Sequence, residues 1–175
     1  MSGFQLFATP WWVNCFILVP VVPYLLSKNG KIRIGRKRLL LAALFGIAFG
    51  FVEAAVVVYL RAATGLWPDP PAKVLGAIPG HLVKIECFRE AATIVMLGTI
   101  AWLAGQRIKE KTVAFLWTFA FWDLFYYVWL RLTIGWPGSL LTSDVLFLLP
   151  MPWVAQVWFP ILVSCLTALV IWFRS

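Results

Sequence analysis

Long apolar runs separated by short polar linkers dominate the sequence. Five of these runs have roughly 17 to 23 residues each, which is enough to cross the ~30 Å apolar core of a bilayer as helices. They lie at about residues 11–27, 39–61, 82–104, 112–134 and 154–173. The pattern therefore predicts an all-α integral membrane protein, in which residues 1–175 form a single membrane domain with five spans.

Proline and glycine add local detail to these runs. Pro20 and Pro23 remove backbone donors inside the first run, so we expect a kink there. Gly46 and Gly50 lie four residues apart in the alanine-rich second run, a spacing that permits close helix packing. Residues 67–73 contain three prolines and are expected to form an extended turn.

The linker before the last run, residues 135–153, is too long and too apolar for a simple exposed loop. A helix over residues 140–149 would span only about 15 Å, and Thr142 or Ser143 could cap its start. We therefore expect a short re-entrant or interfacial helix within residues 139–150, in front of the last span.

Composition supports a membrane protein without a separate soluble domain. The chain is 62% hydrophobic and 13% charged, with a mean hydropathy of +0.89, whereas an average soluble domain has about 25% charged residues. The three cysteines, Cys15, Cys87 and Cys165, are single and far apart, and His81 is the one histidine. Because the sequence has no paired cysteines or histidines, we expect no haem, no structural zinc and no redox motif. It also has no phosphate-binding loop, so we expect no nucleotide.

The net charge of +8 would fit nucleic-acid binding, but the positions of the basic residues indicate membrane topology instead. Six of the 15 basic residues lie in residues 28–38 and three more in residues 105–111. Alternate linkers are therefore basic, as the positive-inside rule requires. We expect a protein of the cell (inner or plasma) membrane with its amino terminus outside and its carboxy terminus in the cytoplasm. The lipid bilayer is its expected partner, and no nucleic acid is expected.

Most of the seven acidic residues lie inside the apolar runs, where a charge costs about 2.5 to 3.5 kcal/mol. Glu53 is in the second run, Glu86 and Glu90 are in the third, Asp123 is in the fourth, and Asp144 is in the expected short helix. Counted at 1.5 Å per residue, the four acids of the spans lie roughly 6 to 13 Å below the outer boundary. We therefore predict that they share a polar cavity in the outer half of the bilayer.

Helical spacing adds further groups to this cavity. Glu86, Arg89, Glu90 and Thr93 follow one stripe of the third run, so Arg89 can pair with both glutamates. Two arginines, Arg61 and Arg131, end their runs near the outer surface and are expected to form a basic rim. The candidate catalytic residues are Glu53, Glu86, Arg89, Glu90 and Asp123, and the candidate substrate-binding residues are Trp122, Tyr126, Tyr127, Arg131 and Asp144.

Three functions are compatible with such a layer of acids. The first is a cavity that binds a cation, a proton or a small ligand for transport or sensing, because clustered carboxylates can share protons and their oxygens suit hard cations. Any metal would be held by Glu53, Glu86, Glu90 and Asp123. The second is an intramembrane enzyme that uses carboxylate acid–base chemistry on a lipid or isoprenoid. The third is an accessory subunit, whose polar layer docks companion membrane subunits or a second copy of the chain.

Overall fold

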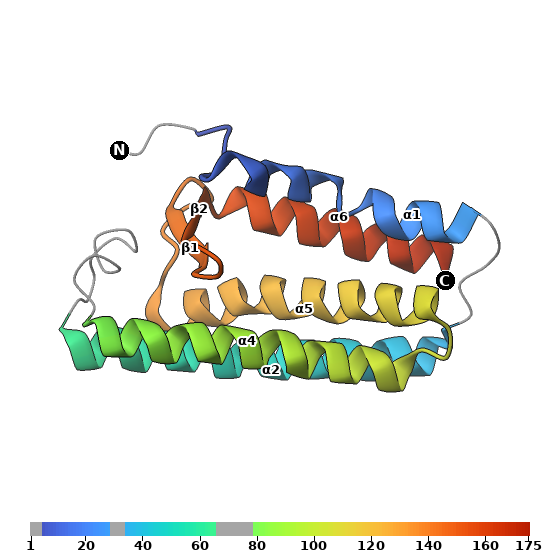
Figure 1. Ribbon diagram of the computed structural model, residues 1–175, viewed down its shortest axis with the longest axis horizontal. Helices are drawn as coiled ribbons and strands as arrows, with labels where there is room; N and C mark the ends of the chain where they lie inside the picture. The colour runs from blue at the N-terminus through green and yellow to red at the C-terminus, as the bar shows by residue number, and fades with distance from the viewer. Residues whose placement is uncertain (1–4, 29–33, 66–78) are drawn as a thin grey trace.

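A computed structural model describes residues 5–28, 34–65 and 79–175. Helix α5 (Ile108–Ile134) is central and contacts three other long helices, α2 (Arg36–Thr64), α4 (Gly80–Ala104) and α6 (Trp158–Arg174). In Figure 1, α2 and α4 lie below α5, and α6 lies above it together with the N-terminal segment. The fold is a helical bundle arranged around α5.

The first apolar run is divided into two helices. Residues Trp11–Leu18 form the 3₁₀ helix η1, and residues Val21–Lys28 form the α-helix α1. The break falls at Val19 and Pro20, so the predicted kink is confirmed, and the missing N–H of Pro20 explains its position. Both helices contact α6.

Four helical segments of the described chain are long and apolar enough to cross a membrane: residues 11–28, 36–64, 80–104 and 108–134. They match the first four predicted runs to within four residues at each end. The fifth apolar helix, α6, has 17 residues and begins at Trp158, because the residues before it are in a strand. The turn expected at residues 67–73 lies outside the described residues, as do residues 29–33 of the basic linker.

A two-stranded hairpin replaces the short helix that we expected within residues 139–150, and that prediction is wrong. Strand β1 (Ser143–Phe147) pairs antiparallel with β2 (Trp153–Gln156), and Figure 1 shows the hairpin at one end of the bundle. Pro150 and Pro152 lie in the connection, where they remove the backbone donors that a continuing helix would need. The hydrogen bonds between β1 and β2 pair backbone N–H and C=O groups that would otherwise be paired within a helix.

Two glycines bring α2 and α5 into close contact. A Cβ atom at Gly46 would lie 2.7 Å from the carbonyl oxygen of Thr118, and one at Gly50 would lie 2.9 Å from that of Trp122. No side chain fits at such distances from a neighbouring backbone. The close packing that the Gly46–Gly50 spacing predicts is therefore confirmed.

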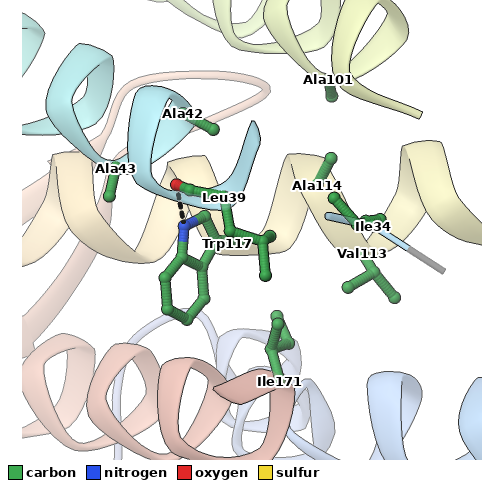
Figure 2. Close-up of a cluster of buried hydrophobic side chains, with 9 residues drawn as sticks. All are labelled: Ile34, Leu39, Ala42, Ala43, Ala101, Val113, Ala114, Trp117 and Ile171. Atoms are coloured by element: carbon green, nitrogen blue, oxygen red, sulfur yellow. Dashed lines mark hydrogen bonds between the residues drawn. The ribbon is translucent and has the colours of Figure 1, made fainter. Parts of the chain in front are cut away.

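The end of the bundle opposite the hairpin is closed by apolar side chains. The indole N–H of Trp117 donates a hydrogen bond to the carbonyl of Leu39 at 2.8 Å, which links α5 to the start of α2. Figure 2 shows these two residues in a buried cluster with Ile34, Ala42, Ala43, Ala101, Val113, Ala114 and Ile171. This packing leaves the hairpin end as the place where polar side chains gather.

Candidate functional site

A cavity of about 280 Å³ lies between α5, α6, η1, the hairpin and the adjoining parts of α2 and α4. Most of its wall is apolar or aromatic, including Phe16, Phe115, Phe119, Phe147 and Val163. Nine of the ten candidate residues also line it: Glu53, Glu86, Arg89, Glu90, Trp122, Asp123, Tyr126, Tyr127 and Asp144. Arg131 does not line the cavity.

Arg89 joins the acids of α2 and α4. Its Nε and Nη2 atoms lie 2.8 and 2.7 Å from one carboxylate oxygen of Glu86, and its Nη1 atom forms an ion pair with Glu53. The hydroxyl of Thr93 also donates to Glu53. The spacing along α4 predicts the contact with Glu86, but the second carboxylate comes from α2 rather than from Glu90.

Glu90 holds the hairpin against α4. Both of its carboxylate oxygens accept the backbone N–H of Leu148, each at 2.9 Å. Leu148 follows β1 directly, so this contact fixes the end of the strand across the cavity from α4. Glu90 is buried, and this backbone donor satisfies its carboxylate in the place of a cation.

Two aspartates lie on the other side of the cavity, toward α5, α6 and the hairpin. The hydroxyl of Ser164 donates to Asp123 at 2.7 Å, and the hydroxyl of Tyr127 donates to Asp144 at 2.9 Å. The N–H of Val145 donates to the second oxygen of Asp144 at 2.9 Å. Each aspartate is therefore held by neutral donors.

Asp144 lies in β1, outside the membrane-spanning helices, and is almost fully buried. Burial raises its pKa from the usual 3.8 to about 6, because the charged carboxylate loses its hydration. The hydrogen bond from Tyr127 and the positive charge of Arg61 oppose this rise. Asp144 therefore changes its charge close to physiological pH.

The two arginines expected at an outer rim differ in their surroundings. Arg131 is exposed and donates hydrogen bonds to the carbonyls of Gly135 and Pro137, so it caps the end of its own helix. Arg61 is only 5% exposed and lines the cavity, with its guanidinium 4.8 Å from the ring centre of Trp136. The prediction of a shared rim is wrong, because α2 turns Arg61 inward.

The indole nitrogens of two tryptophans in the cavity wall are buried without a hydrogen-bond partner in the described structure: Nε1 of Trp122 and Nε1 of Trp153. Phe147 lies between them, with its ring 6.1 Å from Trp122 and 5.2 Å from Trp153. Buried donors are usually paired, so these two nitrogens mark a part of the wall that lacks acceptors.

Within the described residues, no group of three or more His, Cys, Asp or Glu side chains is arranged to hold a metal ion. Of the four acids named as metal ligands, Glu53 and Glu86 share Arg89, and the other two accept from the backbone of Leu148 and from Ser164. Their arrangement does not support the predicted use of Glu53, Glu86, Glu90 and Asp123 as one ligand set.

The list of candidates omitted four polar residues of the cavity wall: Arg61, Thr93, Ser164 and Thr167. Ser164 and Thr167 are buried polar residues one turn apart on the otherwise apolar helix α6. That spacing could have identified Ser164 as a cavity residue from the sequence. The residues around Arg61 and Arg131 give no sign of which arginine is buried. No protein-family model, no curated protein and no solved structure matches the chain.

Proposed function

We propose that this protein spans the cell membrane five times, binds a single-chain lipid or isoprenoid in its cavity, and acts on the polar group of that ligand by carboxylate acid–base chemistry. The observation that supports the proposal most directly is the composition of the cavity wall. It is apolar and aromatic over most of its surface, with ionisable side chains from α2, α4, α5 and β1. Such a wall suits an extended apolar chain with a polar group, whereas a bare cation needs no apolar wall.

The size of the cavity favours a lipid with a single hydrocarbon chain. Its volume of about 280 Å³ is close to the lower limit of about 300 Å³ for pockets that enclose small ligands. Phe16 from η1, Phe119 from α5 and Val163 from α6 all line it. A lipid with two acyl chains would need a wider opening between these elements.

Two carboxyl groups in different surroundings provide an acid and a base. Asp144 has a pKa of about 6 and can gain or lose a proton under physiological conditions. Asp123 is held by Ser164 from α6, and the charge of Asp144 acts on it. In this proposal, Asp144 and Asp123 exchange protons with the ligand, and Glu53 and Glu86 orient Arg89.

The topology in this proposal counts α6 as the fifth span. In Figure 1, the end of α1, the start of α2, the connection between α4 and α5, and the carboxy terminus lie at one end of the bundle, and the hairpin lies at the other. The positive-inside rule then puts the basic end in the cytoplasm, and the amino terminus and the hairpin outside. The cavity would open in the outer half of the bilayer.

A proton site for transport or sensing is the second candidate. The pKa of Asp144, about 6, favours it, because the charge of a buried group would follow changes of pH near neutrality. This candidate requires no bound lipid, so the content of the cavity separates the two functions.

The test is native mass spectrometry of the protein in nanodiscs, with two tryptophan variants of α6. Val163 lines the cavity, whereas its neighbour Leu162 is exposed on the outer face of the helix. We expect the wild type and Leu162→Trp to carry one single-chain lipid, and Val163→Trp to lose it because the indole fills the cavity. Equal lipid content in both variants would contradict the proposal. A companion subunit at fixed stoichiometry would support an accessory subunit instead.

A further inference from the structure

We infer that the ligand of this cavity carries an oxyanion, a phosphate or a carboxylate, and that Arg61 binds it. The inference rests on the proposed function and deepens it, because it names the chemical class of the polar group. It assigns to Arg61 a role in choosing an anionic lipid over the neutral alcohol with the same chain.

The first observation is that Arg61 is buried without a partner of opposite charge. Its side chain lines the cavity, the residue is 5% exposed, and no described carboxylate lies within ion-pair distance of it. Its guanidinium also makes no hydrogen bond to the described part of the chain, and it lies 4.8 Å from the ring centre of Trp136. Buried guanidinium groups are usually paired, so this one has donors left for a ligand.

The neighbouring charged groups already have other partners. Arg89 is paired with two carboxylates, and Arg131 donates to carbonyls at the end of its own helix. Asp144 is close enough for Arg61 to lower its pKa, but its oxygens accept from Tyr127 and from its own strand. Arg61 is therefore the arginine at this end of the described bundle whose donors remain unused.

The position of Arg61 at the end of α2 does not explain its burial by itself. A cation in the last turn of a helix is stabilised by the helix dipole, but an exposed cation gains this stabilisation as well. Instead, the guanidinium lies beside Trp136, whose ring is 6.2 Å from that of Tyr127. A guanidinium that contacts an aromatic ring keeps the N–H groups of its edge for two parallel hydrogen bonds to an oxyanion.

The unpaired indole N–H groups of Trp122 and Trp153 are a second, independent observation. Both residues line the same cavity, and both nitrogens are donors that lack acceptors among the described residues. The five carboxylates of the cavity wall already accept from other groups of the chain, so the two indoles are donors without an acceptor in the described part of the chain, and they fit a ligand that is rich in acceptor oxygens. Phosphate and carboxylate groups provide such oxygens, whereas an alcohol or an ammonium group provides few or none.

The test compares lipids that differ only in the charge of the polar group. Lauric acid is compared with dodecanol, and farnesyl phosphate with farnesol, by titration into the purified full-length protein in nanodiscs and native mass spectrometry. We expect the wild type to bind the anion of at least one pair about tenfold more tightly than the alcohol. The pair that shows this preference identifies the oxyanion as a carboxylate or a phosphate.

Arg61→Gln is expected to bind the alcohol as the wild type does and to lose the preference for the anion. Arg131→Gln is the matched control, because Arg131 lies outside the cavity, and it should keep the preference. Arg61→Lys keeps the positive charge but lacks the paired N–H donors of the guanidinium, so it should keep part of the preference for the anion. This variant tests the inference if Arg61→Gln does not fold.

Three outcomes would overturn the inference. A wild type without preference for either anion would overturn it while leaving the lipid site in place, as would an Arg61→Gln or Arg61→Lys protein with the full preference. A wild type that binds none of the four lipids would overturn both this inference and the proposed function.

Discussion

Arg89 is the residue that holds the acids of α2 and α4 together. If Arg89 is replaced by methionine, Glu53 and Glu86 lose their shared cation inside the protein. We expect Arg89→Met to lower the free energy of unfolding by about 3 kcal/mol, because removing one partner leaves buried charges uncompensated. Unfolding of the purified protein by detergent titration would measure the change.

A double-mutant cycle provides the control for this prediction. The variant Glu53→Gln with Arg89→Met removes a charge from each side, so its stability should fall by less than the sum of the two single changes. If Arg89→Met alone is as stable as the wild type, the ion pairs contribute nothing to the fold.

Asp144 makes the stability of the protein depend on pH. Its pKa of about 6 in the fold is above the usual 3.8, so between these values the folded protein holds a proton that the unfolded chain has lost. Stability should therefore fall as pH rises from about 4 to about 6, by up to about 3 kcal/mol, and change little above that range. Detergent unfolding at several pH values would show this slope.

The variant Asp144→Asn should lose most of this slope, since asparagine keeps the shape but cannot ionise. The groups that act on Asp144 are the guanidinium of Arg61 on α2, the hydroxyl of Tyr127 on α5 and the backbone N–H of Val145. An unchanged slope in Asp144→Asn would assign the pH dependence to a different group.

Residue types and helical periodicity identified most of the polar side chains of the cavity but not their partners. Counting residues from the ends of the runs predicts that Glu53, Glu86, Glu90 and Asp123 lie at similar depths in the bilayer, and in the structure all four line one cavity. The contacts of Glu90 with the backbone of Leu148 and of Asp123 with Ser164 join elements that are far apart in the chain. Such contacts depend on how the helices are rotated about their axes, which a single sequence does not specify.

At the scale of whole elements, the contact between α2 and α5 depends on small residues. We expect Gly46→Ala to destabilise the fold by about 1 to 3 kcal/mol, because the new methyl group would meet the backbone of Thr118 at 2.7 Å. Gly98 on α4 has open space around the same position, so Gly98→Ala should be neutral or slightly stabilising. Thermal unfolding of both variants would test the pair, and equal effects would contradict the close approach.

The elements themselves were predictable wherever an apolar run was long. The first four runs gave helices near the expected residues because a long apolar segment in lipid must pair its own backbone groups. The hairpin was missed because a short apolar stretch has no periodicity that separates a strand from a helix. Its sequence contained one further sign, since Pro150 is the last residue of the range in which we expected a helix and Pro152 follows it closely.

At the scale of the whole molecule, the central prediction concerns α6 and the orientation of the chain. Ser139 and Ser175 are exposed at opposite ends of the bundle, with the hairpin and α6 between them. In a chain without its native cysteines, we expect Ser139→Cys to react with an impermeant maleimide in intact cells, and Ser175→Cys to react only after the cells are opened. Reaction of both from one side would show that α6 does not cross the membrane.

The short length of α6 has a consequence for the surrounding lipid. Its 17 residues span about 26 Å, whereas the apolar part of α2, residues 39–60, spans about 33 Å. In the topology that we propose, the ~30 Å apolar core of a typical bilayer is therefore matched on the side of α2 and is thicker than the length of α6. Hydrophobic mismatch of this kind thins the bilayer locally. The side of the protein that carries α6 and η1 should therefore gather short-chain lipids, next to the elements that enclose the cavity.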